Sequence, residues 1–109
     1  VASPETVVCQ LRPLSDIIVE HGVERIDLLK IDCEGAEEAA LLGLRDEHWP
    51  MVHQTVIEVH DIDGRLNRIV EILRNNGLTE ITIEKEAALK QTRLSNVYAH
   101  RPRPHEQAT

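Results

Sequence analysis

The chain has 109 residues, of which 41% are hydrophobic, and 12 basic against 19 acidic side chains give a formal net charge of −7. This length predicts one small domain, and the acidic balance argues against nonspecific binding to nucleic acid or to anionic membranes. No apolar run approaches the roughly 20 residues that cross a bilayer, and two cysteines are too few for a disulfide scaffold. We therefore expect a cytoplasmic protein.

The predicted elements alternate between strands, rich in β-branched residues, and helices with apolar residues at helical spacing. In chain order we expect a strand at 6–11, a helix at 14–20 with Ser15 as its N-cap, a strand at 26–31, a helix at 35–44, a strand at 54–60, a helix at 65–75, and strands at 80–85 and 96–100.

This order predicts an α/β sheet in which two parallel strands with helices are followed by an antiparallel terminal hairpin. We assign residues 1–101 to the domain and expect 102–109, which contain two prolines, to form a disordered tail. Because the first residue is valine, we expect a processed product or a piece of a longer polypeptide.

The most informative segment is 26–37, I-D-L-L-K-I-D-C-E-G-A-E, in which an apolar strand ends in acids and a glycine. Ligands of open α/β sheets bind outside the carboxyl ends of the strands. Asp32 and Glu34 lie two residues apart, so their side chains point the same way on an extended backbone. They are candidates for a general base, a substrate ligand or a metal ligand. Alternatively, Asp32 caps the next helix and Glu34 lies in its first turn.

Lys30 interrupts this apolar strand, and a buried ammonium group needs a partner. Asp32 or Glu58 on the neighbouring strand could be that partner, and a structural ion pair and a substrate-binding role both stay open. Cys33 lies beside acids, which favour the thiol over the thiolate, so we do not expect a nucleophile there.

The strand at 54–60 places Glu58, His60 and Asp61 at the same edge of the sheet. His60 is the most natural proton acceptor near neutral pH, although a structural loop histidine is the alternative. The D-I-D-G sequence at 61–64 lacks the further ligands of a calcium loop, so we interpret it as a turn and assign no metal site.

Two blocks carry a family resemblance: L-L-K-I-D-C-E-G-A-E at 28–37 and V-I-E-V-H-D-I-D-G-R-L at 56–66, with a tryptophan–proline break between them and N-V-Y-A-H-R at 96–101. Together they resemble the FkbM family of S-adenosylmethionine-dependent methyltransferases, with a departure at Cys33, where valine is usual. The resemblance extends from about residue 14 to residue 101. It implies the C-terminal half of a class I, Rossmann-like methyltransferase sheet. The glycine-rich turn that holds the cofactor in such folds is absent from the sequence.

The resemblance also implies a function. The chain would be the acceptor-side portion of an S-adenosylmethionine-dependent O-methyltransferase whose substrate is a small molecule such as a sugar or a polyketide or peptide natural product. The catalytic residues would be Asp32, Glu34 and His60. The substrate-binding residues would be Lys30, Gly35, Glu58 and Asp61. Two alternatives stay open: an inactive binding or dimerisation module, and a metal-dependent α/β hydrolase that uses the three catalytic candidates.

The missing first half has a further consequence. The strand at 28–32 would lie at an edge of the sheet, with backbone groups that no neighbour satisfies. Either residues 7–11 occupy the vacant position, or two chains pair edge to edge. We expect the second outcome, a homo-oligomer.

Overall fold

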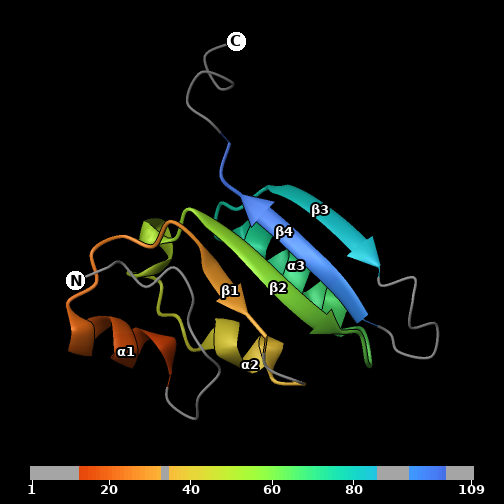
Figure 1. The fold of residues 1–109 in the computed structure, drawn as a ribbon, viewed down its shortest axis with the longest axis horizontal. Helices are drawn as coiled ribbons and strands as arrows, with labels where there is room; N and C mark the ends of the chain where they lie inside the picture. The colour runs from red at the N-terminus through yellow and green to blue at the C-terminus, as the bar shows by residue number, and fades with distance from the viewer. Residues whose placement is uncertain (1–12, 33–34, 86–93, 103–109) are drawn as a thin grey trace.

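The computed structural model describes residues 13–32, 35–85 and 94–102, which form a four-stranded sheet with its helices packed on one face (Figure 1). The elements are α1 (Leu14–His21), β1 (Leu29–Ile31), α2 (Glu37–Leu42), the 3-10 helix η1 (Trp49–Met51), β2 (Gln54–His60), α3 (Arg65–Asn75), β3 (Glu80–Lys85) and β4 (Leu94–His100).

The strand order across the sheet is β1-β2-β4-β3. β1 is parallel to β2, whereas β4 runs antiparallel to both β2 and β3. Ile57, near the centre of β2, lies between Ile31 of β1 and Val97 of β4. The prediction of two parallel strands followed by an antiparallel pair is therefore confirmed.

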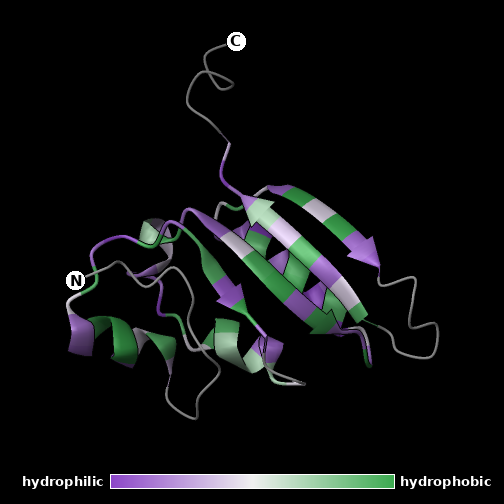
Figure 2. Ribbon diagram, viewed as in Figure 1, coloured by the Kyte–Doolittle hydropathy of each residue, from purple (hydrophilic) through white to green (hydrophobic). Residues whose placement is uncertain are grey.

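The core lies between one face of this sheet and the three α-helices. Along β2 the buried residues Thr55, Ile57 and Val59 alternate with half-buried ones. Figure 2 shows hydrophilic and hydrophobic residues along the same strands. Because side chains of a strand point alternately to its two faces, one face of β2 meets the helices. The buried apolar residues of this core are Leu14, Ile18, Ile26, Leu29, Ile31, Leu41, Leu44, Trp49, Val52, Ile57, Val59, Ile69, Leu73, Leu78, Val97 and Ala99.

Two elements are shorter than predicted. The strand expected at 26–31 is ordered as a strand only over Leu29–Ile31, and Ile26 makes an isolated parallel bridge with Val52. The helix expected at 35–44 covers only Glu37–Leu42, because Gly35 has a left-handed φ of 81° that an α-helix does not contain. β4 is longer than expected and begins at Leu94.

Ser15 is not the N-cap of α1, contrary to the prediction. Pro13 occupies that position, and Ser15 is fully buried within the helix. The Ser15 hydroxyl accepts a hydrogen bond of 2.7 Å from the backbone N–H of Arg45 and lies 2.7 Å from Nδ1 of His48. A tertiary contact thus uses the oxygen that would otherwise cap the helix, and it joins α1 to the segment before η1.

Arg101 connects three distant parts of the fold. Its Nε donates to the carbonyl of Val52 at 2.9 Å, its Nη1 to that of Asn76 at 2.9 Å, and its Nη2 to that of Trp49 at 2.6 Å. Burial lowers the pKa of the guanidinium, which still remains charged at neutral pH. Residues 103–109 of the expected tail lie outside the described residues.

Candidate functional site

The carboxyl ends of β1 and β2 lie side by side because the two strands are parallel neighbours. Ile31 is level with Ile57, so the same register, continued by one residue, places Asp32 level with Glu58. Asp32 is exposed, and Glu58 and His60 are half-buried. The three predicted residues therefore lie toward the carboxyl ends of two neighbouring parallel strands, where α/β folds bind ligands, and their roles in a site stay predictions.

The helix-capping alternative for Asp32 is wrong. α2 begins at Glu37, its N-cap is Ala36, and no side chain makes a capping hydrogen bond there. Asp32 is left exposed at the end of β1. Cys33 and Glu34 lie outside the described residues, so the catalytic role of Glu34 stays a prediction.

Lys30 is exposed, contrary to the expectation of a buried ammonium group. It pairs with Val56 on the sheet face opposite the core, and within the described ranges it forms no ion pair with Asp32 or Glu58. The reason is that side chains alternate along β1, so that Leu29 and Ile31 face the core and Lys30 faces away from it. The need for a structural partner disappears, and the substrate-binding role stays a prediction.

Glu37 is the residue that the sequence-based prediction missed. Its side chain is fully buried, although an acid in the first turn of a helix is ordinarily explained by the helix dipole and an exposed position. Oε1 accepts a 2.9 Å hydrogen bond from the backbone N–H of His60 and lies 3.7 Å from Nη1 of Arg65. The available signal was its place as the last residue of the 28–37 block.

His60 is held from both sides at the end of β2. Glu37 accepts from its backbone N–H, and Nη1 of Arg65 donates to its backbone carbonyl at 2.9 Å. The ring is 31% exposed, and its Nδ1 lies 3.3 Å from Oε2 of Glu37. Neither of these two buried atoms makes a hydrogen bond of good geometry to the described part of the chain.

Gly35 and Asp61 have structural roles as well as predicted ones. The left-handed φ of Gly35 turns the chain after β1, and a Cβ on this residue would lie 4.0 Å from Nη1 of Arg65. Asp61 Oδ1 accepts a 3.1 Å hydrogen bond from the backbone N–H of Leu66 in the first turn of α3. Their predicted contacts with substrate stay predictions.

The turn interpretation of 61–64 is supported by positive φ angles at Asp63 and Gly64.

An ion pair joins α3 to α2: Nε of Arg68 donates to Oε2 of Glu38 at 2.9 Å. This hydrogen bond lowers the pKa of Glu38. The pair therefore stabilises the fold above the ordinary titration range of glutamate, and its contribution is lost as the pH falls through the lowered pKa.

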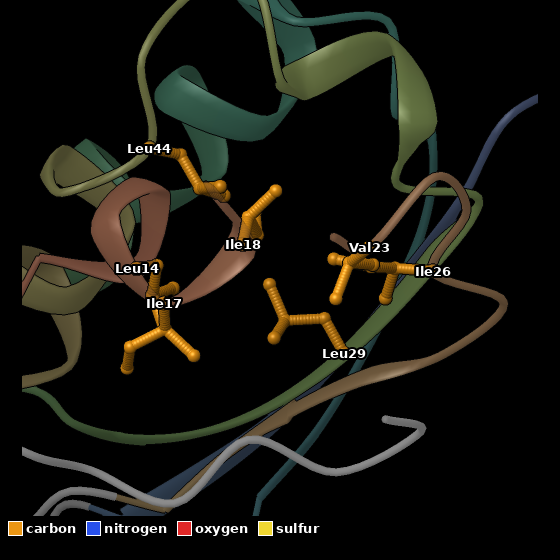
Figure 3. Close-up of a pocket in the computed structure, with 7 residues that line it drawn as sticks. All are labelled: Leu14, Ile17, Ile18, Val23, Ile26, Leu29 and Leu44. Atoms are coloured by element: carbon orange, nitrogen blue, oxygen red, sulfur yellow. The ribbon is translucent and has the colours of Figure 1, made fainter. Parts of the chain in front are cut away.

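Two observations concern space and ligands for a bound group. Within ranges 13–32, 35–85 and 94–102, no three His, Cys, Asp or Glu side chains gather as a metal site. An apolar cleft lies between α1 and the segment that leads into β1, but its volume of about 10 Å³ suits only one water molecule (Figure 3). Its lining residues are Leu14, Ile17, Ile18, Val23, Ile26, Leu29 and Leu44.

Across the described ranges 13–32, 35–85 and 94–102, no helix has both the length and the apolar character needed to cross a membrane.

Comparison with known proteins identifies relatives of this chain. The family described as "Methyltransferase FkbM domain" matches residues 3–79. The chain is 43% identical to the 31-O-demethyl-FK506 methyltransferase FkbM of Streptomyces tacrolimicus over 88 residues, which are 81% of this chain and 34% of that protein. It is 46% identical to the AMB antimetabolite synthetase AmbE of Pseudomonas aeruginosa over 99 residues, 86% of this chain and 5% of that protein.

A third relative, the methyltransferase sdnD of Sordaria araneosa, is 40% identical over 76 residues, 62% of this chain and 29% of that protein. No solved structure matches the chain. The chain thus spans about a third of the length of the FkbM enzyme. The matched family and these identities confirm the resemblance of the 28–37 and 56–66 blocks: the chain belongs to the FkbM family of methyltransferases.

Proposed function

We propose that this chain forms the acceptor side of an O-methyltransferase that takes its methyl group from S-adenosylmethionine. The observation that carries the proposal is the parallel pairing of β1 with β2, which directs Asp32, after β1, and His60, at the end of β2, to the same carboxyl-terminal edge of the sheet. The names of two relatives, a 31-O-demethyl-FK506 methyltransferase and an antimetabolite synthetase, favour a hydroxylated small molecule of the polyketide or peptide type as the acceptor.

The same proposal assigns the sheet to the C-terminal half of a class I, Rossmann-like methyltransferase. The parallel pair β1 and β2, followed by the reversed strand β4 inserted beside β2, supports this assignment. So does the packing of α1, α2 and α3 in one core. Because the glycine-rich turn is absent from this sequence and the apolar cleft is small, the cofactor contacts are assigned to residues beyond those described.

Transfer of a methyl group to a hydroxyl requires a positioned acceptor and a group that takes its proton. S-adenosylmethionine supplies the methyl group. Asp32, exposed at the end of β1, orients the acceptor hydroxyl. His60, partly exposed at the end of β2, takes the proton, and Lys30, Gly35, Glu58 and Asp61 complete the acceptor side.

The Asp32→Asn substitution tests this proposal in the gene product that contains the sequence. We expect turnover to fall by roughly 10²-fold, since misplacement of a reacting group has effects of this size. The measurement is transfer of labelled methyl from S-adenosylmethionine to 31-O-demethyl-FK506 and to hydroxylated polyketides and peptides.

Asp46→Asn is the matched control because Asp46 is exposed in the segment before η1. Both variants should unfold at the temperature of the wild type. Unchanged turnover in Asp32→Asn, or no labelled product from any acceptor with the wild type, would contradict the proposal.

We also propose that two chains pair through the outer edge of β1. This strand is one of the two outer strands of the described sheet, and an unpaired edge recruits another strand. Light scattering of this chain at micromolar concentration should give a mass of about 25 kDa, twice the 12.3 kDa of one chain, as expected for a two-fold dimer. A single species of 12.3 kDa at every concentration would rule the pairing out.

A further inference from the structure

Glu37 and His60 face each other with one unpartnered atom apiece. Oε2 of Glu37 belongs to a side chain with no exposed surface, and it lies 3.3 Å from Nδ1 of His60. Among the described residues, neither atom has another hydrogen-bond partner. A buried carboxylate oxygen without a donor is costly, and a proton on Nδ1 of His60, 3.3 Å away, would supply one.

The backbone of His60 is held beside Glu37. Oε1 of the same carboxylate binds the backbone N–H of His60, and Arg65 binds the backbone carbonyl of His60. The Arg65 guanidinium, 18% exposed, also lies 3.7 Å from Oε1 and balances the buried negative charge. A small ring rotation would therefore complete an Nδ1–H to Oε2 hydrogen bond without moving the backbone.

A neutral imidazole carries a proton on only one of its two nitrogens. An acceptor beside one nitrogen keeps the proton on that nitrogen and leaves the other nitrogen unprotonated. We propose that Glu37 is a positioning residue that keeps the proton of neutral His60 on Nδ1, so that Nε2 is the proton acceptor for the methyl acceptor's hydroxyl. This inference rests on the proposed function for the role of Nε2, but its structural part concerns the free chain alone.

The Glu37→Gln substitution gives a specific expectation. Glutamine has the shape of glutamate but only one oxygen, and that oxygen is needed by the backbone N–H of His60. The amide N–H₂ then faces Nδ1, which must accept, and the proton moves to Nε2. The fold is preserved while the tautomer is reversed, and the wrong tautomer removes the proton acceptor.

The experiment is ¹⁵N NMR of the 109-residue chain labelled at histidine, without substrate, at a pH well above the ordinary titration range of histidine. A His60→Gln variant assigns the His60 signals. Wild type should show a protonated Nδ1 and an unprotonated Nε2 at His60, and Glu37→Gln should show the reverse. Glu38→Gln, at the neighbouring surface position, should leave the wild-type pattern unchanged.

A second measurement is turnover of the gene product, which should fall by roughly 10²-fold in Glu37→Gln. A wild-type His60 protonated on Nε2 would overturn the inference without any variant, as would an unchanged tautomer in Glu37→Gln. A reversed tautomer with full turnover would overturn the catalytic part. Because the NMR measurement uses no substrate, its result is independent of whether the chain serves methyl transfer.

Discussion

Replacement of Arg101 by alanine is expected to lower the free energy of unfolding by about 3 kcal/mol or more. The guanidinium donates to the carbonyls of Trp49 in η1, of Val52, the C-cap of η1, and of Asn76, the C-cap of α3. Its loss leaves the carbonyls of Val52 and Asn76 without their donor, whereas the carbonyl of Trp49 keeps the bond from the N–H of Val52. Hydrogen bonds from a charged group are stronger than neutral ones. Urea denaturation measures the effect as a lower midpoint.

Arg74→Ala is the control for this substitution. Arg74 lies in the last turn of α3 and is exposed, so its loss should cost less than about 1 kcal/mol. Arg101→Lys should remain destabilising, since one ammonium group cannot reach three separated carbonyls as a planar guanidinium does. Equal losses of unfolding free energy in Arg101→Ala and Arg74→Ala would contradict this prediction. They would show that water hydrogen-bonds to these carbonyls as well as Arg101 does.

Gly77→Ala is the second substitution with a large expected effect, about 3 kcal/mol of destabilisation. Gly77 has a φ of 93°, which L-residues rarely adopt, and a Cβ at this position would overlap Nη1 of Arg101. The guanidinium would have to leave the carbonyl of Asn76. Backbone strain and a lost hydrogen bond thus act together, and thermal or urea unfolding measures their sum.

Gly22→Ala separates the two contributions. Gly22 also has a left-handed φ, of 62°, but a Cβ there would meet no atom within 4 Å. Its substitution by alanine should lower the free energy of unfolding only through backbone strain, by about 1 kcal/mol. In an Arg101→Ala background, Gly77→Ala should cost at least about 1 kcal/mol less than in the wild type, because neighbouring residues are energetically coupled. Additive costs would contradict the predicted overlap.

These two residues bear on the candidate site indirectly. Arg101 follows β4, which pairs with the whole length of β2, and β2 carries Glu58 and His60 at its other end. Stability measured through Arg101 and Gly77 therefore reports on the sheet that presents the site, whereas Asp32→Asn and Glu37→Gln report on its chemistry. The first class should lower the free energy of unfolding, and the second class should lower turnover without changing the free energy of unfolding.

Local patterns in the sequence determined several elements to the residue. The predicted strand at 54–60, helix at 65–75 and strand at 80–85 agree with β2, α3 and β3 at both ends. Each is bounded by turn residues, such as the Asp63-Gly64 and Asn76-Gly77 pairs, and has a clear alternation or helical spacing of apolar residues. The 28–37 and 56–66 blocks also determined the family, which the comparisons confirm.

Only the tertiary structure decided the roles of Ser15, Glu37, Lys30 and Arg101. Ser15 contacts residues at least 30 positions away, Glu37 a strand end 23 positions away, and Arg101 carbonyls 25 to 52 positions away. Lys30 is exposed because it lies on the face of β1 that points away from the core, and the packing of the helices decides which face that is. Spacing within one segment predicts which side of that segment is apolar, but the partner of a polar group is set by elements that the chain brings together only when it folds.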